Sequence, residues 1–102
     1  MPPESPLKTL ERLDAELLKL VNDCNSSALN DGALSRKHKL LIAMALDAAH
    51  GTADGVRSLA QQALRVGATK DEVMEALRVA FYISGAGAVY TAARALGEVF
   101  PQ

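Results

Sequence analysis

Apolar residues recur at steps of three and four along almost the whole chain, which is the period of one face of an α-helix. The clearest stretch is GATKDEVMEAL, residues 67–77, where a glycine that can end one helix precedes Thr69 and Glu72 at capping-box spacing. No stretch alternates between apolar and polar residues as a half-buried strand does, and FYI at 81–83 continues the helical period. The sequence therefore predicts an all-α fold.

Helix boundaries are predicted from the residues that commonly begin and end helices. Ser5 and Pro6 resemble an N-cap followed by proline at the first helical position, while Ser35 and Thr52 can each cap a later helix. The stretch NSSALNDGALS, residues 25–35, has the composition of a loop, and SGAG at 84–87 is expected to break the chain again. The predicted helices cover residues 7–23, 35–49, 52–66, 69–83 and 88–99.

Length and charge narrow the classes of protein to which the chain can belong. At 102 residues there is material for one domain, and we expect a flexible segment at 1–6 followed by a single helical domain over 7–102. The 11 basic and 12 acidic side chains are scattered and give a net charge of −1, so neither nucleic acid nor an anionic membrane is an expected partner. The proline-rich start does not resemble a signal peptide, which favours a cytoplasmic location.

Few side chains are available to bind a metal. Cys24 is the single cysteine, and the two histidines, His38 and His50, are twelve positions apart. These residues do not have the spacing of a zinc site, and Cys24 has no partner for an intramolecular disulfide. We therefore predict no metal and no cofactor.

The apolar content is high for a chain of this length. Hydrophobic residues make up 49% of the sequence, and residues 40–46 are apolar without interruption. That run is too short to span a bilayer, so it predicts a helix that is apolar on all sides and buried. Because a small monomer cannot hide so much apolar surface, we expect a homo-oligomer; a compact monomer with alanine-rich exposed faces is the alternative.

Three segments resemble the carboxymuconolactone decarboxylase family, which includes alkylhydroperoxidase D. They are DGALSRKHKLLIAMALDAAHG, AQQALRVGATKDEVMEALRVA and SGAGAVYTAARAL, and together they cover about two thirds of the chain. The resemblance implies an all-α subunit of about five to six helices built around a helical hairpin. It also implies assembly into homotrimers or homohexamers.

The residues that carry chemistry in this family are replaced here. The peroxidase branch carries a glutamate, two cysteines in a Cys-x-x-Cys motif and a histidine, at the positions of Leu40, Thr52, Gly55 and Leu59 in this sequence. Without a thiolate there is no nucleophile for peroxide, and a threonine without a neighbouring base does not replace it. The decarboxylase branch also resembles the peroxidases in having a histidine at the position of Leu59.

Four residues near the replaced motif are candidates for ligand binding: His50, Thr52, Arg57 and Tyr82. His50 is also the candidate catalytic residue, because the end of a helix favours a charged imidazolium. Each has a structural alternative. His50 and Thr52 suit a helix C-cap and N-cap, Arg57 can pair with Asp54, and Tyr82 can fill the core.

Three hypotheses follow for function. The first is a diverged family member whose pocket binds or transforms a small organic acid or lactone-like compound without thiol redox chemistry. The second is a peroxidase activity of the alkylhydroperoxidase type, which would require Cys24 as the reactive thiol. The third is a non-catalytic oligomeric scaffold or ligand sensor.

Overall fold

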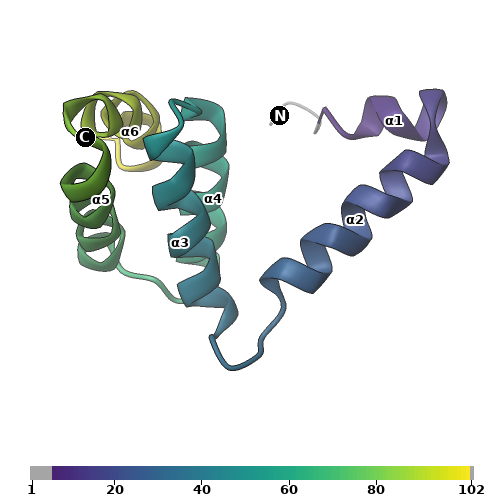
Figure 1. Ribbon diagram of the computed structural model, residues 1–102, viewed down its shortest axis with the longest axis horizontal. Helices are drawn as coiled ribbons and strands as arrows, with labels where there is room; N and C mark the ends of the chain where they lie inside the picture. The colour runs from purple at the N-terminus through teal and green to yellow at the C-terminus, as the bar shows by residue number, and fades with distance from the viewer. Residues whose placement is uncertain (1–5, 102) are drawn as a thin grey trace. The chain divides into compact units, whose positions relative to one another are not determined.

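The computed structural model describes residues 6–101, and every regular element within them is a helix (Figure 1). This confirms the all-α prediction. The chain divides into two compact units, an N-terminal unit that ends at Asn30 and a C-terminal unit that begins at Asp31. The helices are α1 Lys8–Leu13, α2 Ala15–Leu29, α3 Arg36–Ala49, α4 Ala53–Arg65, α5 Lys70–Ser84 and α6 Ala86–Val99.

The N-terminal unit differs from the single helix predicted over 7–23. Asp14 interrupts it with a backbone of φ −161° and ψ 85°, and its carboxylate accepts a hydrogen bond from Leu17 N at 3.0 Å. Aspartate is a favoured N-cap, so Asp14 ends α1 and begins α2. The proposed cap at Ser5 lies outside the described residues.

Helix α2 also extends further than predicted, through Asn25, Ser26 and Ser27 to Leu29. Asparagine and serine favour caps and turns, but their cost inside a helix is only a few tenths of a kcal/mol per residue, so the helix continues through them. Within the described part of the N-terminal unit no residue of α1 or α2 is buried.

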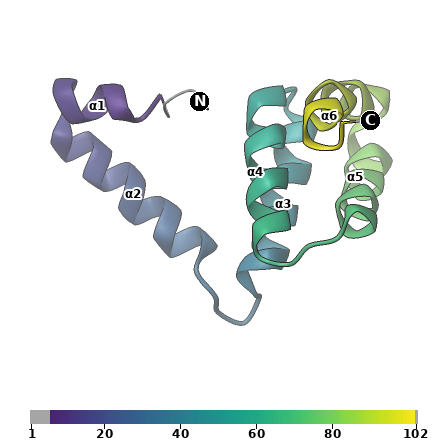
Figure 2. The same cartoon turned by 180° about the vertical axis from the view of Figure 1, so that it is seen from behind.

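The C-terminal unit contains the hydrophobic core. Figures 1 and 2 show α3, α4 and α5 running beside one another, with α6 lying across the end where α3 and α5 finish. The largest fully buried side chains come from α3, α4 and α5, and they are Leu40, Met44, Val56 and Val73. Helix α6 contributes mainly alanines to the core, and small side chains allow it to approach its neighbours closely.

Helix α3 is not buried on all sides, contrary to the prediction for residues 40–46. Leu40, Leu41 and Met44 are buried, whereas Ile42 and Leu46 are exposed. The helical turn of about 100° per residue points these last two side chains away from the core.

Glycines and capping residues set the turns of the C-terminal unit. Gly51 and Gly67 have φ of 80° and 103°, a conformation that costs glycine little, and they follow the ends of α3 and α4. The predicted cap by Ser35 is confirmed, because its hydroxyl accepts from His38 N at 3.2 Å. The break predicted at 84–87 is narrower than expected, since Gly85 alone separates α5 from α6.

Two ion pairs join helices of this unit. Lys37 of α3 donates to Glu72 of α5 at 3.0 Å, and Arg57 of α4 lies 3.1 Å from the Glu98 carboxylate of α6. The other oxygen of Glu72 accepts from Thr69 N, and this bond, followed by the bond from Lys37, lowers the pKa of Glu72.

Among the helices within residues 6–101, none has both the length and the apolar content that crossing a membrane requires.

Candidate functional site

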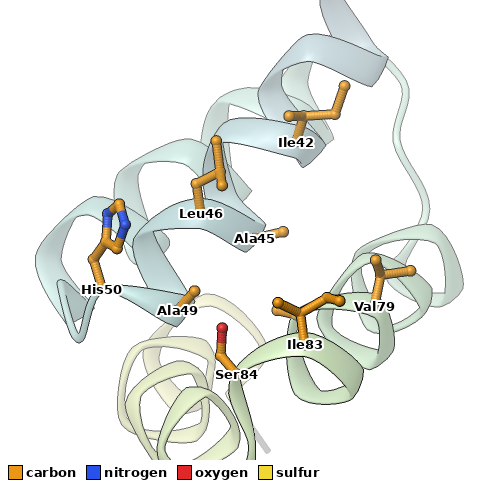
Figure 3. A pocket seen from close by; sticks show the side chains of 9 residues that line it. Ile42, Ala45, Leu46, Ala49, His50, Val79, Ile83 and Ser84 are labelled. Atoms are coloured by element: carbon orange, nitrogen blue, oxygen red, sulfur yellow. The ribbon is translucent and has the colours of Figure 1, made fainter.

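A groove lies between the second half of α3 and the last turns of α5 (Figure 3). Its volume is about 410 Å³, within the range of small-molecule sites. The walls are formed almost entirely by apolar side chains, with His50 and Ser84 as the only residues that carry polar side-chain atoms. The lining residues are Ile42, Ala45, Leu46, Ala49, His50, Val79, Ala80, Ile83 and Ser84.

Small residues on α3 open this groove. Ala45 and Ala49 are four positions apart and therefore lie on the same face of the helix, opposite Val79 and Ile83 of α5. Larger side chains at these alanines would fill the space between the two helices. The spacing of alanines is the sequence signal that could have indicated a groove here.

His50 is the candidate residue that the structure places at the groove. It is the C-cap of α3, and its backbone N donates to Leu46 O at 3.0 Å. Gly51 turns the chain directly afterwards, so the imidazole stays at the end of α3. Within residues 6–101 the exposed His50 ring has no hydrogen-bond partner, so it is available to an incoming group.

Ser84 is the second polar group at the groove, and sequence reasoning missed it. It is the last residue of α5, directly before Gly85. In Figure 3 its hydroxyl points from α5 toward α3. Serine before a glycine suggests only a helix end, so the sequence offered no reason to connect it with His50.

Tyr82 does not line the groove, contrary to its prediction as a polar contact beside His50. Tyr82 is 85% exposed, while the groove wall on the same helix is formed by Val79, Ala80 and Ile83. A step of one residue turns the side chain by about 100°, which takes Tyr82 away from the face that Ile83 occupies. It does not fill the core either.

Arg57 is held by two carboxylates. Nη2 donates to Asp54 Oδ1 at 2.5 Å, and Nη1 lies 3.1 Å from Glu98 Oε2. The bond to Asp54 is the main reason that the pKa of Arg57 is raised, and Glu98 adds to it. The alternative that Arg57 pairs with Asp54 is confirmed, and the guanidinium connects α4 to α6 outside the groove.

Thr52 occupies the N-cap position of α4 without acting as a side-chain cap. Its hydroxyl makes no capping bond, whereas its backbone N donates to Asp47 O at 2.9 Å. It is exposed and does not line the groove. The prediction that its hydroxyl caps α4 is therefore wrong.

The other three positions of the replaced motif contain no reactive group. Leu40 is fully buried in the core, and Leu59 is half-buried on α4. Gly55 lies so close to Asp47 that a Cβ at position 55 would overlap the Asp47 carboxylate. The space that a side chain at position 55 would need is thus taken by the Asp47 carboxylate of α3, a contact that no local sequence pattern indicates.

Metal ligands are not gathered around the groove. Within residues 6–101 no three side chains of histidine, cysteine, aspartate or glutamate lie close enough together to hold a metal ion. Cys24 is exposed on α2 in the N-terminal unit.

Comparison with known proteins identifies the family. The model of the carboxymuconolactone decarboxylase family matches residues 15–98. A crystal structure of an apo carboxymuconolactone decarboxylase family protein from Legionella pneumophila is similar over 94% of this chain and 88% of that one, with 33% identity and a TM-score of 0.86. Comparison with curated proteins found no match. The chain belongs to the carboxymuconolactone decarboxylase family.

Proposed function

We propose that this chain is a diverged family member whose groove binds or transforms a small organic acid or lactone-like compound without thiol redox chemistry. The observation that carries the proposal is the unpartnered imidazole of His50 at the end of a helix, at one end of an apolar groove. An imidazole N–H there would donate a hydrogen bond to a carboxylate or a lactone carbonyl, and apolar walls would hold the carbon skeleton.

Roles can be assigned to the two polar groups. His50 would bind the acidic group and, if the compound is transformed, would donate or accept a proton. The Ser84 hydroxyl would act as a hydrogen-bond donor or acceptor from the opposite wall. Thr52 and Arg57 remain outside this arrangement, since one faces solvent and the other is paired with two carboxylates.

We also propose that the protein is cytoplasmic and forms a homo-oligomer, either a trimer or a hexamer. Support comes from the large exposed apolar residues of the C-terminal unit, which include Ile42 and Leu46 of α3 and Val79 and Ile83 of α5. An apolar surface of this kind is typical of subunit contacts.

The test uses an amphiphilic anion, 8-anilinonaphthalene-1-sulfonate, whose fluorescence rises in apolar sites, and competitors drawn from short carboxylates and lactones. We expect the full chain to bind the dye, and at least one competitor to displace it. His50→Ala should weaken the binding of that competitor by about tenfold or more, because a hydrogen bond to a charged group is lost. His38→Ala is the matched control, since it removes the chain's other histidine.

Equal competitor affinities in wild type and His50→Ala would overturn the proposal. A peroxidase reading makes a separate prediction, that the wild type consumes peroxide with a reductant present and Cys24→Ser does not. Cys24 has no second thiol in this chain to resolve a sulfenic acid, so the proposal expects no such consumption.

A further inference from the structure

The two polar groups of the groove lie at the same end of it. Lys37 near the start of α3 is 3.0 Å from Glu72 near the start of α5, so the two helices run in parallel with their starts together (Figure 1). His50 and Ser84 follow this ion pair along their helices by 13 and 12 residues. At a rise of 1.5 Å per residue, both therefore lie about 18 to 20 Å beyond it.

The opposite end of the groove is apolar. It is lined there by Ile42 of α3 and Val79 of α5, and every other lining residue apart from His50 and Ser84 is also apolar (Figure 3). Ile42 precedes His50 by eight residues, a distance of about 12 Å along the helix. A compound that fills the groove therefore needs one polar head and an apolar tail of about this length.

A second charged group would find no partner at the apolar end. No lysine or arginine lines the groove. Lys37 is engaged with Glu72, and Arg78 lines a separate hollow between α5 and α6. Because a carboxylate that leaves water without gaining a partner is strongly disfavoured, a dicarboxylic acid does not suit this groove.

We propose that the groove selects an amphiphile with a single polar head and an unbranched aliphatic tail. The head, a carboxylate or a lactone carbonyl, lies at His50 and Ser84, and the tail extends toward Ile42 and Val79. The tail preference rests on the proposed function, because it presupposes a ligand in the groove. Every residue that carries it belongs to α3 or α5 of the C-terminal unit.

The head is tested with two acids of equal length, octanoate and octanedioate, titrated into the full chain by isothermal titration calorimetry. They differ only in the group at the far end of the chain. We expect octanoate to bind at least tenfold more tightly, because the second carboxylate would lie beside Ile42 and Val79. Equal affinities, or tighter binding of octanedioate, would overturn the proposal.

The tail is tested with hexanoate, octanoate and decanoate, and with the γ-lactones of the same carbon numbers. A fully buried methylene contributes about 0.8 kcal/mol, which is about fourfold in affinity. We expect at least a fourfold gain for each added pair of methylenes in the series whose head binds. A flat series would overturn the proposal.

A matched pair of variants shows whether the tail lies in the groove. Ala45→Leu fills the space between α3 and α5, so the gain with tail length should be lost. Ala93→Leu adds the same side chain on an exposed position of α6 outside the groove and should keep the gain. A gain that survives in Ala45→Leu would place the tail elsewhere and overturn the proposal. The comparison of the two acids uses the wild type alone, so it does not depend on how the variants fold.

The proposed function and the tail preference fail in different ways. If His50→Ala binds octanoate and the lactones as tightly as the wild type does, the proposed function fails. If binding depends on His50 but octanedioate binds as well as octanoate, the proposed function stands and the preference for a single polar head is wrong.

Discussion

Helices α4 and α5 both begin at a threonine, yet the two threonines hold their helices in different ways. Thr69 has an extended backbone, with φ −96° and ψ 162°, and forms a complete capping box with Glu72. Thr52 has ψ 82° and makes no side-chain cap bond. The start of α5 is therefore fixed by residues that are local in sequence, whereas the start of α4 depends on α3 through the bond from Thr52 N to Asp47 O.

The difference follows from the chain leading into each helix. Only Gly51 and Thr52 lie between His50 and the first residue of α4, so the chain must reverse direction within a few residues. This tight turn holds Thr52 away from the extended conformation that an N-cap uses. Thr52 is therefore part of a turn that is supported from α3.

The largest effect is expected at Gly55, where α4 lies against the Asp47 carboxylate. Gly55→Ala should lower the free energy of unfolding by about 1 to 2 kcal/mol, because the overlap with Asp47 outweighs the better helix propensity of alanine. Denaturant unfolding measures this. In an Asp47→Ala background the same substitution should stabilise the protein by about 0.5 to 1 kcal/mol. The same cost in both backgrounds would mean that the Asp47 carboxylate is not what disfavours a side chain at position 55.

The local cap gives the next largest effect. Thr69→Ala removes the hydroxyl that accepts from Glu72 N at 3.1 Å, and we expect a loss of about 1 kcal/mol in the free energy of unfolding. Urea unfolding of this variant and of Thr69→Ser separates the lost bond from the lost methyl group. If the serine variant is as unstable as the alanine variant, the capping bond is not what stabilises this end.

These two helix starts show how much the sequence predicts. The capping box at 69–72 follows from residue types three positions apart, and the all-α class follows from the apolar period. The break at Asp14 is harder to predict from the sequence, because several residues nearby could act as a helix cap. The close approach of Asp47 to Gly55 cannot be predicted from the sequence, because a tertiary contact has no local signature.

The candidate site was predicted in part for the same reason. A helix end at His50 could be recognised from the following glycine, and the structure places His50 at the groove. The sequence prediction included Tyr82 and missed Ser84. The reason is that the face of α5 that meets α3 is set by contacts between residues far apart in the chain, such as Lys37 and Glu72, which are 35 positions apart. A shift of one residue on a helix changes the face by about 100°.

Acid should weaken the start of α5 through Glu72. Its pKa is lowered in the folded state, so its contribution to stability is present above the ordinary glutamate pKa of about 4.3 and is lost as the pH falls below that value. Glu72→Gln keeps an acceptor for Thr69 N but does not titrate, so its stability should fall less between pH 5 and pH 3 than that of the wild type. Urea midpoints at each pH measure this, with Glu75→Gln on the exposed face of α5 as the control. Parallel acid profiles for wild type and Glu72→Gln would contradict the assignment.

The smallest effect is expected at Thr52, although its position in the sequence suggests a cap. Because its hydroxyl makes no capping bond, Thr52→Ala should change the free energy of unfolding by only a few tenths of a kcal/mol, well below the value expected for Thr69→Ala. The two alanine variants unfolded in the same urea series give a direct comparison of the two helix starts. A loss at Thr52 as large as that at Thr69 would show that its side chain does cap α4 in solution. A small loss would mean that the turn is stabilised by the backbone bond from Thr52 N to Asp47 O. Because any residue except proline can make that bond, other side chains at position 52 should then be compatible with the fold.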